Sequence, residues 1–325
     1  MFEIQRYNTT DQSAWDTFVP RGNNGTLFHL RAFLNYHPEN RFKDHSLLIK
    51  KKGKLFSVFP AAEKKIGGTI HLVSHPGASV GSFVVPESLS IADSMALVDC
   101  LVTYAKGGEF DRIRITLPPT LYQRRLSNYM DFAFFKQNFH YVKRDITSIL
   151  FLEESLETTV EKFRSSHRRA VRKANEKGVV VRQSNDFDSF YRILEKNLNI
   201  RHGVTPTHSL EELKHIHELF PDKINLFAAY LENTMVAGVV NFIVNHHVVL
   251  AFYISHDENY AEYRAVNLLF YSIFDWAIQS HFKIYDFGTF TVDEEPNMGL
   301  GRFKENFGAS GISCIVFNVN SAKWI

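Results

Sequence analysis

Cysteine is scarce in this chain, and no apolar run is long. The two cysteines, Cys100 and Cys314, each lie in an apolar stretch of the 325-residue sequence. Because residues 1–8 carry no signal-like pattern, we expect reduced thiols and a cytoplasmic protein rather than a disulfide framework. The best apolar candidate, 239–254, is interrupted by the polar residues 245–247. It is too short to cross a bilayer, so the sequence predicts no integral membrane segment.

Charge is nearly balanced, except in one segment. The chain has 37 Lys and Arg against 35 Asp and Glu, a net charge of +2. Residues 162–182 hold eight basic residues and one acid, so this segment carries +7 and the remainder −5 (2 − 7 = −5). A cluster this local favours a phosphate site. It argues against the broad basic face that binds duplex nucleic acid.

Motifs for covalent or metal-assisted catalysis are missing from the sequence. It has no G-x-S-x-G elbow and no recognisable Cys/His nucleophile arrangement, so we expect no covalent enzyme intermediate. His215 and His217 lie two residues apart on a predicted helix and point to different faces. A shared metal ion is therefore not expected there.

One pattern of strands and turns occurs twice. Residues 46–62 form two apolar runs around a polar turn at Gly53, and residues 226–240 do the same around Asn233, 180 residues later (233 − 53 = 180). Each copy continues with an apolar helix that leads into a strand. These helix–strand segments are 96–117 and 267–288. We therefore predict two copies of one domain.

A basic helix opens the second half. The pattern of residues 160–177 predicts a helix, on which Arg168 and Arg172 are four residues apart and share a face. Two guanidinium groups on one face are suited to a diphosphate or a carboxylate; the alternative is a solvated basic helix. A polar turn after the next predicted helix, 186–199, contains Arg201 and His202, two further candidates for ligand contact.

Four motifs in the second half resemble those of a known family. They are VAG at 236–238, FYISH at 252–256, YDFG at 285–288 and GLGRFKENFG at 299–308. In this order they resemble the FemAB-like and BioF2-like branch of the GNAT acyltransferase superfamily, and the first half resembles the degenerate N-terminal copy of that branch. The resemblance implies an α+β fold of two tandem GNAT domains, 1–150 and 151–325, each with a mixed, largely antiparallel twisted sheet flanked by helices. In FemX-like members the C-terminal strand crosses to the first domain, so we expect 314–320 to do so here.

The resemblance also implies how the site would work. In GNAT enzymes two central strands part, and free backbone N–H groups of the first hold the carbonyl of the donor while the acceptor amine approaches. Here the parted strands are expected at 248–254 and 284–288. The donor would then be held near Phe252 and Ile254.

Several side chains near this gap are candidates for function. Lys304 follows Phe303 in the FK pair of the family, and its ammonium would stabilise an oxyanion unless it is a surface lysine. Asp286 would accept the proton of the amine or cap a turn, and Tyr253 would protonate the leaving group or lie in the core with a hydrogen-bonded tip. We assign catalysis to Lys304, Asp286 and Tyr253, and acceptor binding to Phe303, Arg168, Arg172, Arg201 and His202.

The donor segment departs from the usual GNAT pattern. Coenzyme A enzymes carry Q/R-x-x-G-x-G/A, so that backbone N–H groups surround the pyrophosphate. Here Glu262, Ala265 and Asn267 stand at the three specified positions, and the acid would repel a phosphate. Arg264 of the same segment is kept as a donor-binding candidate. The family includes users of acyl-CoA and users of aminoacyl-tRNA, so both donors stay open, and no metal is implied.

We expect an N-acyltransferase that moves an acetyl or aminoacyl group to an amine. The acceptor would be a cell-envelope precursor or a nucleotide- or phosphate-linked sugar, small or lipid-linked, in peptidoglycan or polysaccharide assembly. One alternative is a transferase of the peptidoglycan-bridge type that uses charged tRNA. Another is a GNAT scaffold that only binds ligands after losing its donor site.

Overall fold

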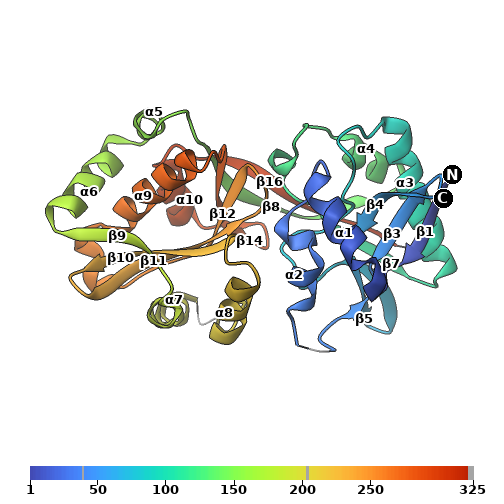
Figure 1. The fold of residues 1–325 in the computed structure, drawn as a ribbon, viewed down its shortest axis with the longest axis horizontal. Helices are drawn as coiled ribbons and strands as arrows, with labels where there is room; N and C mark the ends of the chain where they lie inside the picture. Colours follow the sequence, from blue (N-terminus) through green and yellow to red (C-terminus); the bar gives the residue numbers. More distant parts are fainter. Residues whose placement is uncertain (39, 203–204, 321–325) are drawn as a thin grey trace. The chain divides into compact units, whose positions relative to one another are not determined.

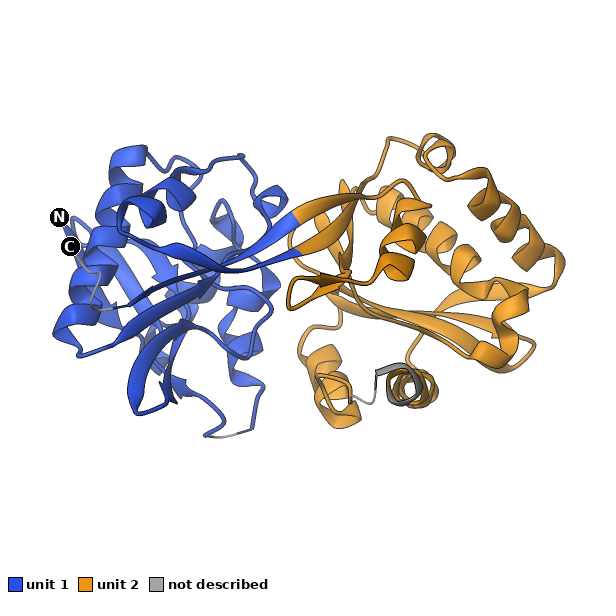
Figure 2. Cartoon of the chain, turned by 180° about the vertical axis from the view of Figure 1, so that it is seen from behind, with its two compact units in different colours: residues 1–145, 313–325 blue, residues 146–312 orange. Residues whose placement is uncertain are grey.

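The chain divides into two compact units, Met1–Asp145 with Ser313–Ile325, and Ile146–Ile312 (Figure 2). The computed structural model describes residues 1–38, 40–202 and 205–320, and of residues 199–202 the backbone only. The boundaries of the units fall inside two strands, β8 (His140–Phe151) and β16 (Ser310–Asn320). Each unit is described separately below.

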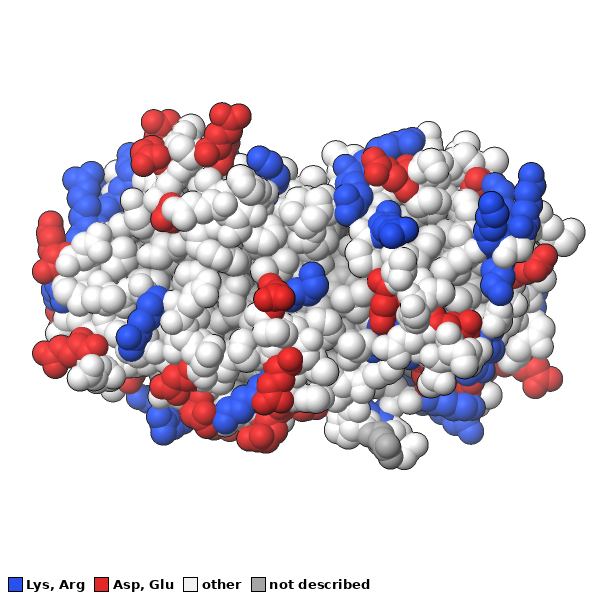
Figure 3. Space-filling view, in the orientation of Figure 1, with Lys and Arg blue, Asp and Glu red and all other residues white. Residues whose placement is uncertain are grey.

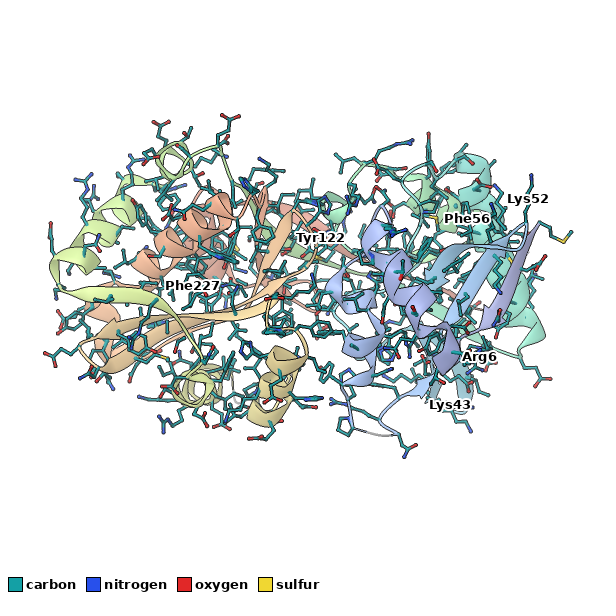
Figure 4. All side chains as sticks on the ribbon, viewed as in Figure 1. Arg6, Lys43, Lys52, Phe56, Tyr122 and Phe227 are labelled. Atoms are coloured by element: carbon teal, nitrogen blue, oxygen red, sulfur yellow. The ribbon has the colours of Figure 1, made fainter. Side chains whose placement is uncertain are left out.

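Unit 1 contains two sheets. An antiparallel sheet has the order β1-β3-β4, and a second group has the order β2-β5-β6-β7-β16, in which only β6 and β7 run parallel. The strands are β1 (Phe2–Arg6), β2 (Lys43–Asp44), β3 (Leu47–Lys51), β4 (Lys54–Phe59), β5 (Ala61–Ile66), β6 (Thr69–Ser74) and β7 (Arg112–Thr116). Glu63 of β5 pairs with Lys43 at 2.6 Å and lies 4.0 Å from Arg6, both labelled in Figure 4.

Helices cover the sheets of unit 1. They are α1 (Gln12–Phe18), α2 (Arg31–Asn35), α3 (Ile91–Gly107) and α4 (Tyr129–Lys136). The longest, α3, begins where the Ser90 side chain accepts a hydrogen bond from the Asp93 backbone N–H, a typical N-cap. Leu97, Leu101 and Ala105 recur at four-residue spacing on its buried face and join the core of this unit.

Unit 2 is built on one mixed sheet. Its strand order is β8-β13-β12-β11-β10-β9, antiparallel except between β12 and β13. The strands that follow β8 are β9 (Val179–Ser184), β10 (Ile224–Leu231), β11 (Thr234–Ile243), β12 (Val248–His256) and β13 (Ile284–Thr289), with the short hairpin β14 (Thr291–Val292) and β15 (Glu295–Pro296). The mainly antiparallel sheets and flanking helices of both units confirm the α+β class.

Helices pack on both faces of this sheet (Figure 1). The face with α9 carries a hydrophobic core, where Phe163, Phe270, Phe274, Tyr285 and Phe307 pack together. On the same face Phe227 of β10, labelled in Figure 4, packs against Trp276 with ring centroids 5.2 Å apart. The helices are α5 (Leu156–Glu161), α6 (Ser165–Glu176) and α9 (Ala265–Gln279) on this face, α7 (Phe187–His202) and α8 (Leu210–Leu219) on the other, and α10 (Met298–Glu305) near the end of β13.

The two units repeat the same local geometry. In unit 1, β6 leads through α3 to a parallel partner, β7, and in unit 2 β12 leads through α9 to a parallel partner, β13. The β3–β4 hairpin has an irregular register after Ile49, and the β10–β11 hairpin has one after Ala229, 180 residues later (229 − 49 = 180). The repeat visible in the sequence thus extends to the positions of the bulges.

Two predicted element boundaries are wrong. The helix predicted at 160–177 is two helices, α5 and α6, because the Arg164 N–H donates to the Asn306 carbonyl at 2.9 Å instead of continuing a helix. The helix predicted to end at Asn199 continues to His202. Arg201 and His202 therefore lie in the last turn of α7 rather than in a loop, and their side chains are outside the described residues. Among the described helices, none has the length and apolar character needed to cross a bilayer.

Gly308 allows a close approach between α10 and the segment that joins α5 to α6. Its φ is +88°, and a Cβ there would lie 2.6 Å from the Lys162 Cβ. Gly178 has a similar φ of +78° but nothing within 4 Å. We expect Gly308→Ala to lower the free energy of unfolding by about 3 kcal/mol and Gly178→Ala by about 1 kcal/mol, because only the first adds a clash to backbone strain. Urea denaturation measures both, and equal losses would contradict the clash.

Candidate active site

The central feature of unit 2 is the separation of β12 from β13. The two strands pair in parallel at Val248↔Ile284, Val249↔Tyr285 and Leu250↔Asp286, and their pairing ends there. A bulge then follows in β12, because Tyr253 faces Val240 of β11 whereas Ala251 faces Asn241. Phe252 is the additional residue at the bulge, which turns the strand away from β13. The parting of strands predicted near Phe252 and Asp286 is therefore present.

A cleft of about 580 Å³ lies alongside the free part of β12. Its walls come from the end of β12, the start of α9, the middle of α7 and the start of α10, all in unit 2. The residues that line it are Leu194, Asn197, Leu198, Ile254, Ser255, His256, Ala261, Arg264, Ala265, Val266, Asn267, Asn297, Gly299, Leu300 and Phe303. This volume is typical of a small-molecule site, with mostly apolar walls and a few polar groups.

The N-terminus of α9 forms one end of this cleft. Arg264, the N-cap residue, has a left-handed backbone with φ of +58°, and no side chain in the described part of the chain caps the helix. The first-turn N–H groups and the guanidinium therefore favour an anion at this end. Asn267 is buried, and its Nδ2 has no hydrogen-bond partner among the described residues, which leaves a donor for a ligand in the cleft.

Glu262 does not oppose an anion in this cleft as the sequence suggested. Its carboxylate lies 2.6 Å from the Lys177 ammonium, and the hydrogen bond from Lys177, together with its charge, lowers the pKa of Glu262. Glu262 is also absent from the described lining of the cleft, whereas Arg264 belongs to it. Although the donor motif differs from the usual pattern, the residue that it presents to the cleft is therefore a cation, Arg264.

Lys304 and Asp286 both hydrogen-bond to the turn at the end of β13, and neither is among the described residues that line the cleft. Lys304 is buried, and its Nζ donates to the carbonyls of Gly288 at 2.7 Å and Thr289 at 2.9 Å. Burial lowers the pKa of Lys304 to about 8, which the nearby Asp286 partly offsets. The Asp286 carboxylate accepts from the Thr147 hydroxyl and from the Gly288 N–H at 2.7 Å. Lys304 is therefore not a surface lysine, and Asp286 caps the turn at Gly288.

Tyr253 points away from this group. Its hydroxyl accepts a hydrogen bond from the His208 N–H at 3.0 Å and lies 2.9 Å from the His208 Nδ1. Burial raises the pKa of Tyr253 to about 12, which makes it a poor proton donor near neutral pH. Tyr253 is not among the described residues that line the cleft. This geometry matches the alternative of a core tyrosine with a hydrogen-bonded tip.

Phe303 connects the cleft to α6. It lines the cleft and packs against Phe270, Phe307 and His167. His167 of α6 is half-buried beside it, and its pKa is lowered by burial and by the Arg264 charge. The neutral form of His167 is therefore favoured. Phe303, Ile254 and Arg264 are the predicted residues that line one cleft together.

The basic helix α6 presents most of its charge to solvent. Figure 3 shows Lys and Arg gathered along this helix, where Arg164, Arg169, Arg172 and Lys173 are exposed. Arg168 differs, because its Nη1 donates to the carbonyls of Phe163 at 2.7 Å and Glu161 at 3.2 Å. It thereby satisfies carbonyl groups around the end of α5, so the predicted pair of guanidinium groups has one exposed member, Arg172.

Sequence patterns did not identify two polar residues of this site. The Asn197 Nδ2 donates to the Ser255 hydroxyl at 2.8 Å and to the His256 carbonyl at 2.6 Å, which holds α7 against the end of β12. The Asn297 side chain caps α10 by accepting from the Leu300 N–H at 3.0 Å and lines the cleft. The N-cap spacing before α10 was a signal for Asn297. The sequence offered no signal for Asn197, because its hydrogen-bond partners are about 60 residues away.

Within the described part of the chain, no cluster of His, Cys, Asp and Glu could hold a metal ion.

Comparisons with known proteins agree with this geometry. Residues 161–305 match the family described as "Acetyltransferase (GNAT) domain". The structure of FemX is similar over 98% of this chain and 97% of its own, with a TM-score of 0.76 and 16% identity. The C-terminal domain of a putative lysylphosphatidylglycerol synthetase from Agrobacterium fabrum is similar over 97% and 93%, with a TM-score of 0.61 and 11% identity.

A third similar structure is a tandem GNAT protein from the clavulanic acid biosynthesis pathway. It covers 98% of this chain and 98% of its own, with a TM-score of 0.55 and 8% identity. No curated protein sequence matches this chain. The parted strands and the family match together show that residues 161–305 form an acyltransferase domain of the GNAT superfamily, in a chain with the FemX fold.

Proposed function

We propose that this protein transfers an acyl or aminoacyl group to the amine of a cell-envelope precursor or of a nucleotide- or phosphate-linked sugar. The observation that carries the proposal is the cleft beside the parted strands, which has apolar walls and a positive end. The FemX and lysylphosphatidylglycerol synthetase neighbours support a transferase fold. Both proposed donors are made in the cytoplasm, where we place the reaction.

The arrangement suggests a role for each part of the site. The positive end at α9 binds phosphate of the donor, and the apolar walls hold its acyl arm. The backbone of β12 beyond Leu250 orients the donor carbonyl, and the acceptor nitrogen attacks the carbonyl carbon. The Lys304 ammonium stabilises the oxyanion that forms. As the carbonyl is restored, the bond to the leaving group breaks, and the proton that the acceptor nitrogen loses passes through water to the leaving group. Asp286 keeps Gly288 and the end of β13 in position for this step.

Acyl-CoA is the donor that the cleft fits better. A phosphate-bearing donor with a flexible thioester arm matches a mostly apolar cleft that ends at a helix N-terminus. The orphan Asn267 Nδ2 supplies a further hydrogen bond to such an arm. Aminoacyl-tRNA remains the second candidate donor, since its terminal aminoacyl ester also requires a site for an activated carbonyl.

Titration calorimetry distinguishes between the two candidate donors. We expect acetyl-CoA to bind with one site per chain and charged tRNA to bind more weakly, and the donor that binds should then support transfer to an amino sugar nucleotide. Binding of a donor without transfer to any amine would favour the alternative of a scaffold that only binds ligands. If neither donor binds, the transferase proposal is wrong.

The acceptor assignment has its own test. We expect Arg172→Ala to raise the acceptor KM several-fold without changing the thermal midpoint, because Arg172 is exposed on α6. Arg168→Ala should instead lower the free energy of unfolding by about 1–3 kcal/mol, because two carbonyl groups lose their donor. Arg169→Ala, on an adjacent face of α6, is the control. An unchanged acceptor KM in the double variant of Arg168 and Arg172 would remove this assignment.

A further inference from the structure

The outer face of α4 in unit 1 is unusually apolar for a surface helix. Phe132 is 51% exposed, Phe135 67% and Tyr129 38%, and Leu126 just before the helix is 62% exposed. The three aromatic residues recur every three positions and so form one stripe. We call these four residues the α4 patch.

The fold of unit 1 does not explain the α4 patch. The opposite face of α4 packs against α3 and is already filled, with Ala133 and Phe134 buried. Phe134 contacts Phe83, Phe139 and Phe317. Four large apolar side chains clustered on the surface favour an interaction site, because isolated exposed residues are usual but clusters are not.

Basic residues flank the α4 patch along the chain. Residues 121–145 contain five Lys and Arg and two acids, Asp131 and Asp145, so this segment carries +3 (5 − 2 = +3). Asp131 is partly buried, and burial raises its pKa to about 6. Lys143 is paired with Asp145 at 3.0 Å. Another acid, Asp99 of α3, accepts a hydrogen bond from the Gln137 side chain at 3.3 Å, just after the end of α4. The basic residues are Arg124, Arg125, Lys136, Lys143 and Arg144.

We propose that the α4 patch docks this protein on an anionic lipid surface. Aromatic side chains are favoured at the boundary between headgroups and acyl chains, and flanking cations add attraction to anionic lipids. A second copy of this chain is the less suitable occupant. A helix of eight residues is about 12 Å long, and a stable dimer buries about 800 Å² on each partner.

Flotation with lipid vesicles tests this proposal on the full-length protein. We expect binding to vesicles of equimolar phosphatidylcholine and phosphatidylglycerol, weak binding to phosphatidylcholine alone, and release by salt. The double variant Phe132→Ser and Phe135→Ser should lower the partition coefficient at least about tenfold, because two aromatic groups no longer enter the interface. Lys136→Glu should lower it several-fold.

Matched controls keep the test decisive. Ile66→Ser removes another exposed apolar side chain of unit 1, 43% exposed at the end of β5, and should leave binding unchanged. The Phe132 and Phe135 side chains are exposed, so the double variant should keep its thermal midpoint. The proposal is overturned if wild-type protein does not float with anionic vesicles, or if the double variant floats equally well. It is also overturned if light scattering shows a dimer that the double variant dissociates, since the α4 patch would then join two copies.

Discussion

Lys304→Met should reduce kcat for acyl transfer by about 100- to 1,000-fold. The reason is that the substitution removes the only cation that contacts the Gly288 and Thr289 carbonyls among the described contacts, at the point where β12 and β13 part. Losing one group that stabilises a developing oxyanion has effects of this size. Methionine keeps the length and volume of the side chain, so the cleft should stay intact. Steady-state kinetics at saturating donor measure the effect.

The protonation of Lys304 gives a second readout. Its pKa is about 8, so wild-type kcat should fall as pH rises through about 8, when the ammonium loses its proton. The methionine variant should lack this descending limb. The effect on stability has the opposite sign. Between pH 8 and the ordinary lysine pKa of about 10.5 the unfolded chain binds more protons, so wild-type stability should rise with pH relative to the variant. A wild-type activity that stays flat through pH 8 would exclude the charge of Lys304 from catalysis.

Arg264→Glu should raise the donor KM by about 10- to 100-fold with a smaller change in kcat. The substitution replaces a cation by an anion beside the uncapped N-terminus of α9, where a phosphate of the donor would lie. Calorimetry should show the same loss for acetyl-CoA in the absence of an acceptor. Low ionic strength should enlarge the difference, because less salt screens the site.

Two variants control for the effect at Arg264. Lys54→Glu makes the same change of charge at an exposed position of unit 1 and should leave the donor KM unchanged. Arg264→Gly removes the cation but relieves the left-handed backbone, so it should weaken donor binding while raising the thermal midpoint. Unchanged donor affinity in both Arg264 variants would show that the donor does not use this end of the cleft.

The sequence predicted the features of the fold that depend on local periodicity. The strand pairs around Gly53 and Asn233 and the helices that lead into strands follow from apolar spacing. The parting near Phe252 follows from the resemblance to a family. Its failures come from tertiary contacts. Nothing in the pattern of residues 160–177 indicates a break at Arg164. The Arg164 N–H bonds to Asn306, and the neighbouring Phe163 packs against Phe307, more than 140 residues away.

The candidate site could also be predicted only in part, because motifs locate some of its residues and tertiary contacts decide the rest. Residue types and motifs located Phe303, Ile254 and Arg264, which line one cleft. Burial decides the chemistry of the others and is not visible in a motif. Tyr253 is held by His208, 45 residues away, and Lys304 titrates near pH 8 only because it is enclosed. The assignments to Lys304, Asp286, Arg172 and the end of α7 stay predictions for the experiments above.

The ribosome makes the last strand of unit 1 only after it has made all of unit 2. Phe317 and Val319 of β16 are buried in the core of unit 1, and β16 pairs with β7, yet these residues follow all of unit 2 in sequence. Domains generally fold in the order in which they emerge. Here the first-made unit should wait without its last strand, with the edge of β7 unpaired, while the second unit forms. A released chain that ends at Ile312 should therefore contain a folded second unit and a protease-sensitive first one.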